Sequence, residues 1–113
     1  MPKALFVANW KMNLLRKDAA DFCKVFLEKT TNCGSLNDVG IAPTFCAFDI
    51  VKSSLPKDRG IMVGTQNVHW LDSGAHTGEI SAKMLLDMGA DFAIIGHSER
   101  RQFYGETDET AYQ

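Results

Sequence analysis

The sequence has no long hydrophobic runs, no excess of basic charge and no signal-peptide cleavage pattern in its first residues. Its apolar runs last four to seven residues, far short of the roughly 20 that a membrane-spanning helix needs. The 12 basic and 14 acidic side chains leave a net charge of −2, which argues against a nucleic-acid binder or a polybasic membrane binder. The first residues run into an apolar segment without a signal-peptide cleavage pattern. We therefore expect a cytoplasmic protein with neither a membrane nor a nucleic-acid partner.

The sequence also lacks the spacing patterns of disulfide frameworks, metal sites and nucleotide sites. Cys23, Cys33 and Cys46 are odd in number and have no CxxC spacing, so we expect reduced thiols. Cys23 and Cys46 fall on apolar helical faces, where packing is the expected role. His69 and His76 lack metal-ligand spacing, and neither GxGxxG nor GxxxxGK(S/T) occurs. We expect no metal and no cofactor.

The sequence does contain a regular alternation of apolar runs and amphipathic segments. Four short apolar runs are typical of buried strands, at 4–10, 39–43, 61–67 and 92–96. Helices are expected at 17–29, from Phe45 to the break near 53–60, at 81–89 with Ser81 as the cap and Gly89 as the terminator, and from Thr107 onward.

This order of elements indicates an α/β protein with a parallel sheet. Strands that alternate with helices pair in parallel through right-handed crossovers. Parallel strands are covered on both faces, which matches the nearly continuous apolar character of the four runs. No repeat, linker or shift in composition marks a boundary, so we expect a single domain over residues 1–113.

Polar residues gather where the first and fourth predicted strands end. Side-chain alternation places Asn9 and Lys11 at one end of one strand face, and His97 at the corresponding end of the fourth strand. If both strands line one interior, an amide, a cation and an imidazole converge there. Each residue alone has a simpler interpretation, as a solvated lysine or a structural histidine. Only their joint placement favours a site.

The residues after His97 add chemistry to this hypothesis. If residues 98–101 open a short helix, the positive end of its dipole favours a neutral imidazole. A neutral imidazole can donate a hydrogen bond to a carbonyl oxygen, while Lys11 stabilises developing negative charge. Glu99 can hold a proton or pair with Lys11. The stretch GHSER is not GxSxG, so Ser98 is not expected to be a nucleophile.

Four motifs resemble the triosephosphate isomerase family, in the family's order along the chain. They are ANWKMN (8–13), GTQNVHW with SGAHTGEIS (64–81), IIGHSERR (94–101) and YGETDE (104–109). The resemblance implies a (βα)4 half of an eight-stranded (β/α)8 barrel, with a site at the carboxyl ends of the strands. It also implies interconversion of glyceraldehyde 3-phosphate and dihydroxyacetone phosphate without a cofactor. The family is a familiar example of a neutral histidine acting beside a glutamate base.

The resemblance suggests roles for individual residues. Asn9 and Lys11 are similar to substrate-binding and electrostatic residues, His97 to the electrophile that polarises the carbonyl, Glu99 to the site carboxylate, and Ser98 to a supporting residue. Thr77 and Glu79 resemble residues that reach the neighbouring subunit, and Arg100 and Glu106 resemble interface and supporting groups.

The resemblance covers four of the family's eight strands. The family's general-base glutamate and its lid come after the sixth strand, and its phosphate loops after the seventh and eighth. We therefore expect little or no isomerase activity from these 113 residues alone, with weak anion binding near Lys11. The fourth helix is expected to be truncated.

Half a barrel leaves two exposed sheet edges, which predicts a partner. Two copies could close eight parallel strands if the fourth strand of each paired with the first strand of the other. Two functions remain open. One is an isomerase whose second half is supplied separately, and the other is a non-catalytic, self-associating scaffold.

Overall fold

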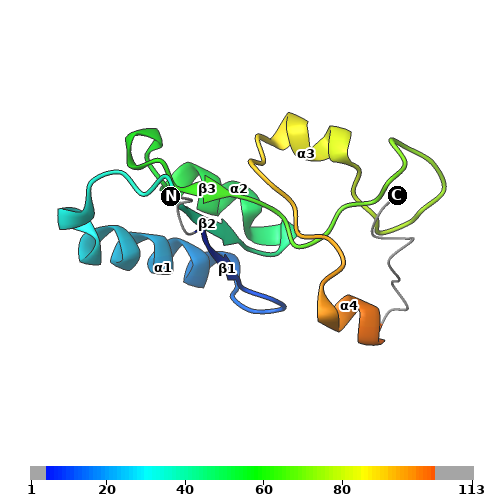
Figure 1. Cartoon of the computed structure of the whole chain (residues 1–113), viewed down its shortest axis with the longest axis horizontal. Coiled ribbons are helices and arrows are strands. Elements are labelled where there is room, and N and C mark those ends of the chain that lie inside the picture. The colour runs from blue at the N-terminus through cyan, green and yellow to red at the C-terminus, as the bar shows by residue number, and fades with distance from the viewer. Residues whose placement is uncertain (1–4, 104–113) are drawn as a thin grey trace.

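The computed structural model describes residues 5–103, and its strands form one parallel sheet. The elements are β1 (Phe6–Asn9), α1 (Arg16–Lys29), β2 (Val39–Ala42), α2 (Phe45–Ser54), β3 (Met62–Val63), α3 (Ala82–Met88) and α4 (Ser98–Phe103), with short 3-10 helices at Thr31–Cys33 and Lys57–Arg59. The strand order is β1-β2-β3, and both pairings are parallel (Figure 1). The predicted α/β class is confirmed.

The register brings the carboxyl ends of the strands to one edge of the sheet. Residues 6–9 pair one for one with residues 39–42. In the next pair, Ile41 lies opposite Val63. The loops that follow β1, β2 and β3 therefore begin side by side, as a site at that edge requires.

The segment 92–96, expected to be a strand, forms only a single bridge between Thr65 and Ala93. The Thr65 N–H donates to the Phe92 carbonyl at 3.0 Å, and the Ile94 N–H donates to the Thr65 carbonyl at 2.9 Å. The segment thus follows the edge beyond β3 without regular pairing. Within residues 5–103 it has a neighbouring strand segment on one side only, whereas a barrel strand is held on both sides.

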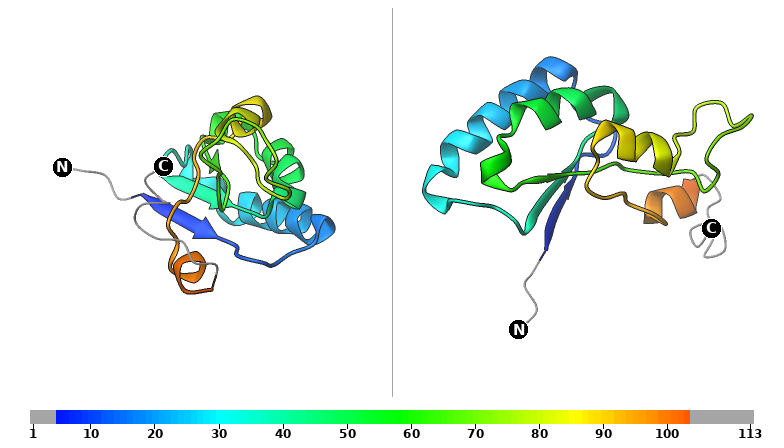
Figure 2. Two further views of the ribbon diagram at one scale, coloured as in Figure 1. Left: turned by 90° about the vertical axis from the view of Figure 1, so that its right-hand side faces the viewer. Right: turned by 90° about the horizontal axis from the view of Figure 1, so that it is seen from above.

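The hydrophobic core lies between the sheet and the two helices α1 and α2, which run side by side along one face (Figure 2). Cys23 is fully buried there, so its expected packing role is confirmed. The same prediction for Cys46 is wrong, because Cys46 is exposed. Helix α2 turns Ala47, Phe48 and Val51 to the core, and Cys46 lies outside that arc. All three cysteines are unpaired.

Local sequence signals set the ends of α3 as expected. The Ser81 hydroxyl accepts a hydrogen bond from the Met84 N–H at 3.2 Å, which caps the first turn. Gly89 ends the helix in the left-handed region with φ 82°, where a side chain would be strained. The helix expected from Thr107 lies outside the described residues. Among residues 5–103, none of the helices is long and apolar enough to cross a membrane.

The opposite sheet face, which corresponds to a barrel interior, is thinly covered. The Phe92 ring lies over two glycines on this face, Gly40 and Gly64. Toward β1 the face is open to water, with Leu5 61% exposed and Val7 41% exposed. Apolar interior residues face water, as expected for a sheet that lacks the other half of a barrel.

Replacing Gly64 by Ala is expected to destabilise the fold by about 1–3 kcal/mol, the typical effect of overpacking. A Cβ at this position would lie 2.5 Å from the Phe92 ring, so the ring would have to move. Urea unfolding followed by circular dichroism measures the effect. The double variant Gly64→Ala/Phe92→Leu is the control, because the smaller side chain makes room for the methyl group and should recover part of the loss. An unchanged midpoint for Gly64→Ala would refute the contact.

Candidate active site

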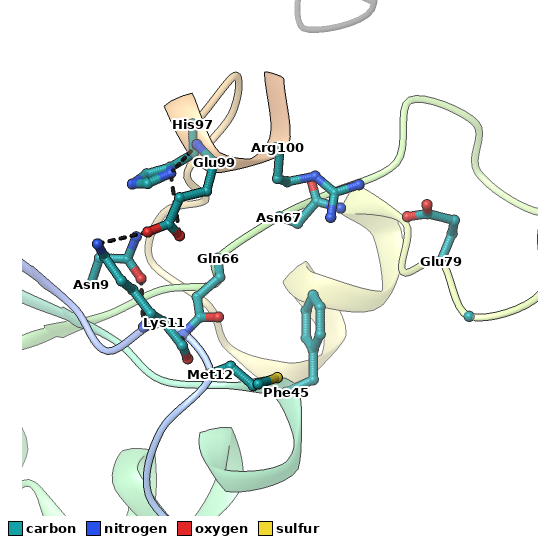
Figure 3. A pocket seen from close by; sticks show the side chains of 11 residues that line it. Asn9, Lys11, Met12, Phe45, Gln66, Asn67, Glu79, His97, Glu99 and Arg100 are labelled. Atoms are coloured by element: carbon teal, nitrogen blue, oxygen red, sulfur yellow. Dashed lines mark hydrogen bonds and ion pairs between the residues drawn. The ribbon is translucent and has the colours of Figure 1, made fainter. Parts of the chain in front are cut away.

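A cavity of about 290 Å³ opens at the carboxyl ends of the strands (Figure 3). Its lining residues are Asn9, Lys11, Met12, Phe45, Gln66, Asn67, Gly78, Glu79, His97, Glu99 and Arg100. The four residues that the sequence singled out for chemistry, Asn9, Lys11, His97 and Glu99, therefore lie around one space. Asn9 and Lys11 come from the end of β1 and the loop after it, and His97 and Glu99 come from the residue before α4 and its first turn.

Lys11 enters the cavity from a bend in the chain directly after β1. Its backbone is left-handed, with φ 58°, a conformation that costs a non-glycine residue about 1–2 kcal/mol. The Asn9 side-chain oxygen accepts a hydrogen bond from the Lys11 N–H at 2.9 Å and supports this bend. Asn9 thus has a structural contact in addition to its place on the cavity wall.

The Lys11 ammonium pairs with Glu99 across the cavity, with 2.7 Å between Nζ and Oε1. This hydrogen bond from Lys11 lowers the pKa of the Glu99 carboxyl below its ordinary value. The side chains of Lys11 and Glu99 are 53% and 41% exposed, so the pair contributes little to stability. The ion pair between Glu99 and Lys11 that the sequence suggested is present.

His97 accepts a hydrogen bond at Nδ1 from the backbone N–H of Glu99 at 3.1 Å. An accepting Nδ1 carries no proton, so the neutral ring holds its proton at Nε2. The 3.8 Å separation between Nδ1 and the Glu99 carboxylate is therefore not an ion pair in this state. A neutral ring with a proton at Nε2 is suited to donate a hydrogen bond to a carbonyl oxygen.

Of the other residues that the resemblance suggested, some line the cavity and others do not. Glu79, from the loop between β3 and α3, and Arg100, from α4, line the cavity on the side away from Lys11 (Figure 3). Thr77 is exposed and does not line it. Ser98 is the first residue of α4, and Glu106 lies outside the described residues.

Sequence reasoning did not single out Gln66, Asn67, Met12 or Phe45, which also line the cavity. The signal for Gln66 and Asn67 was present, because both are polar residues at the end of the third predicted strand, 61–67, at the edge where the site was expected. Met12 and Phe45 gave no such signal, since apolar residues are common at the ends of loops. No three metal-binding side chains come together within the described part of the chain.

A parallel α/β sheet with a polar cavity at the carboxyl ends of its strands is typical of α/β enzymes, both barrels and open sheets, which bind their ligands at that edge. Comparison with known protein families agrees, because the family model described as triosephosphate isomerase matches residues 4–113. The chain belongs to the triosephosphate isomerase family, and its fold is the N-terminal half of that barrel.

Curated relatives confirm the family and show how much of it is present. The triosephosphate isomerase of Picosynechococcus sp. is 42% identical over 113 residues, which are 100% of this chain and 46% of the relative. The Clostridium botulinum enzyme is 46% identical over 112 residues, which are 97% of this chain and 43% of that protein. The chain thus spans slightly less than half the length of these relatives.

Proposed function

We propose that these residues form one wall of a triosephosphate isomerase active site, and that a second half-barrel must supply the other wall. The observation that carries the proposal is the convergence of Lys11, His97 and Glu99 on one cavity, with Lys11 paired to Glu99 and His97 accepting a hydrogen bond at Nδ1. Asn9 and Lys11 would bind the substrate, and His97 would act on its carbonyl group.

Each group then has a defined part in moving a proton between two carbons. His97 donates from Nε2 to the substrate carbonyl oxygen, and the Lys11 ammonium stabilises the negative charge that develops on that oxygen. A base must also remove the proton from the neighbouring carbon. Glu99 is a poor candidate, because Lys11 holds its carboxylate and lowers its pKa. The glutamate base of the family would come from the second half.

Isomerase turnover tests this proposal. The substrate is glyceraldehyde 3-phosphate, and a coupled assay measures its conversion. The 113-residue chain is assayed alone and joined to the remaining part of the Picosynechococcus enzyme. We expect turnover from the joined chain and little or none from the chain alone. A folded but inactive joined chain would count against the proposal.

Replacing Glu99 by Gln is expected to strengthen sulfate binding at the cavity about threefold to tenfold at neutral pH. The substitution removes the partner of Lys11 and the negative charge that repels the anion. Protonation has the same effect, so binding to the unmodified chain should tighten as the pH falls through the lowered pKa of Glu99. NMR titration with sulfate measures both changes.

Two comparisons make this binding experiment specific. Glu28→Gln also removes one carboxylate charge, but on α1 and away from the cavity, so it should leave sulfate affinity unchanged. Lys11→Met should abolish the gain when it is combined with Glu99→Gln. Equal affinities for the unmodified chain and Glu99→Gln would show that anions do not bind at Lys11.

A second function, self-association, is favoured by the uncovered interior face. Leu5 and Val7 are 61% and 41% exposed, and within residues 5–103 the strand β1 pairs with β2 alone. A second copy of this chain would offer the same apolar face and the same free strand edge. We propose a homodimer that closes eight strands, whether or not the assembly is catalytic. The cytoplasmic location stays a prediction.

A further inference from the structure

We propose that Gln66 is a positioning residue that holds the Lys11 backbone in its left-handed bend and so directs the ammonium group into the cavity. The Gln66 side-chain amide donates two hydrogen bonds, one to the Lys11 carbonyl at 2.8 Å and one to the Ala42 carbonyl at 3.0 Å. Figure 3 shows Gln66 beside Lys11 at the base of the cavity. This inference deepens the proposed role of Lys11.

The Lys11 backbone needs such support because its conformation is unfavourable by itself. A lysine with φ 58° lacks the freedom of glycine, so neighbouring groups must hold it there. Asn9 binds its N–H and Gln66 binds its carbonyl. Both backbone polar groups of Lys11 are thus held by side-chain amides, one from β1 and one from the segment after β3.

Gln66 also connects this loop to β2, a strand that is distant from the loop in the sequence. Residues 11–15 make several hydrogen bonds within the loop or to α1, such as the one from Asn13 to the Trp10 carbonyl. Within residues 5–103, two hydrogen bonds tie residues 11–15 to the strand region, the local one from the Lys11 N–H to Asn9 of β1 and the one from Gln66, which comes from the far side of the sheet. Its second bond ends on Ala42, the last residue of β2. Gln66 therefore fixes the Lys11 backbone relative to β2, the central strand.

The side chain of Lys11 has no comparable restraint. It is 53% exposed, and it forms an ion pair with Glu99 that water can disrupt. A change of the Lys11 backbone from the left-handed to the extended region would turn the side chain away from Glu99. The pKa of the Glu99 carboxyl therefore reports whether the Lys11 ammonium is correctly placed.

Carboxyl carbon NMR titration of Glu99 in the 113-residue chain tests the inference. In the unmodified chain the pKa of Glu99 is expected below its ordinary value, because Lys11 donates to it. In Gln66→Met, which keeps the length but loses both donors, that pKa should rise toward the value in Lys11→Met. Adding Gln66→Met to Lys11→Met should cause no further rise, since Gln66 acts through Lys11.

The matched control is Asn13→Ala, which also removes a side-chain amide bonded to a carbonyl of the same loop. It should leave the pKa of Glu99 unchanged. A folded Gln66→Met chain, by circular dichroism, that keeps the unmodified pKa of Glu99 would overturn the inference.

If Gln66→Met does not fold, Gln66→Asn replaces it, because the shorter side chain cannot reach both carbonyls. Failure of both variants to fold would also overturn the inference, since Gln66 would then serve the fold as a whole. The titration involves no substrate, so its failure leaves the turnover proposal untouched. A lack of turnover likewise leaves the titration result standing.

Discussion

Replacing His97 by Ala is expected to lower isomerase turnover about 10²–10⁴-fold in a chain that carries both barrel halves, the usual contribution of general acid–base catalysis. The substitution removes the Nε2 proton that the hydrogen bond at Nδ1 places toward the substrate. The effect should fall on kcat more than on KM, because the hydrogen bond to the carbonyl strengthens as charge develops on the oxygen.

His76→Ala provides the matched control for His97→Ala. His76 is an exposed histidine that does not line the cavity of Lys11, so its removal should leave turnover nearly unchanged. Two results would contradict the proposal that His97 acts in a site completed by a second wall. One is a His97→Ala enzyme with unmodified kcat. The other is turnover by the 113-residue chain alone that disappears in His97→Ala, which would show that no second wall is required.

The 113-residue chain is expected to form a dimer in solution, with a light-scattering mass twice the chain mass of 12.5 kDa. Val7→Lys should weaken this association more than about 100-fold, because dimerisation would bury an unpaired charge. Val7 lies on the interior sheet face, where it neighbours Gly40 in the register.

Leu86→Lys is the matched control for the dimer experiment. Leu86 is an apolar residue that is 77% exposed on α3 rather than on the sheet, so a lysine there should leave the mass unchanged. Circular dichroism establishes that each variant remains folded. A stable, folded monomer of the unmodified chain would refute the dimer, and equal weakening by Leu86→Lys would place the contact elsewhere.

Features that depend on neighbouring residues could be predicted from the sequence. The alternation of elements indicated a parallel α/β sheet, because helical and strand periodicities differ within a few residues. Ser81 and Gly89 marked the ends of α3, since a cap and a left-handed terminator act within one turn. The placement of Lys11 and His97 at one edge followed from the direction in which parallel strands run.

Features that depend on residues distant in the sequence could not be predicted. The burial of Cys23 and the exposure of Cys46 depend on where α1 and α2 meet the sheet. The segment 92–96 has the composition of a strand, but it forms only the bridge between Thr65 and Ala93, because regular pairing depends on the backbone of segments that are distant in the sequence.

The sequence by itself determined the family, the α/β class and the residue types at the carboxyl ends of the strands. Only the tertiary structure decided how those residues meet. The 2.7 Å pair of Lys11 with Glu99 and the two hydrogen bonds of Gln66 join residues more than 20 positions apart. Their energies depend on distances in space, which no local pattern of the chain encodes.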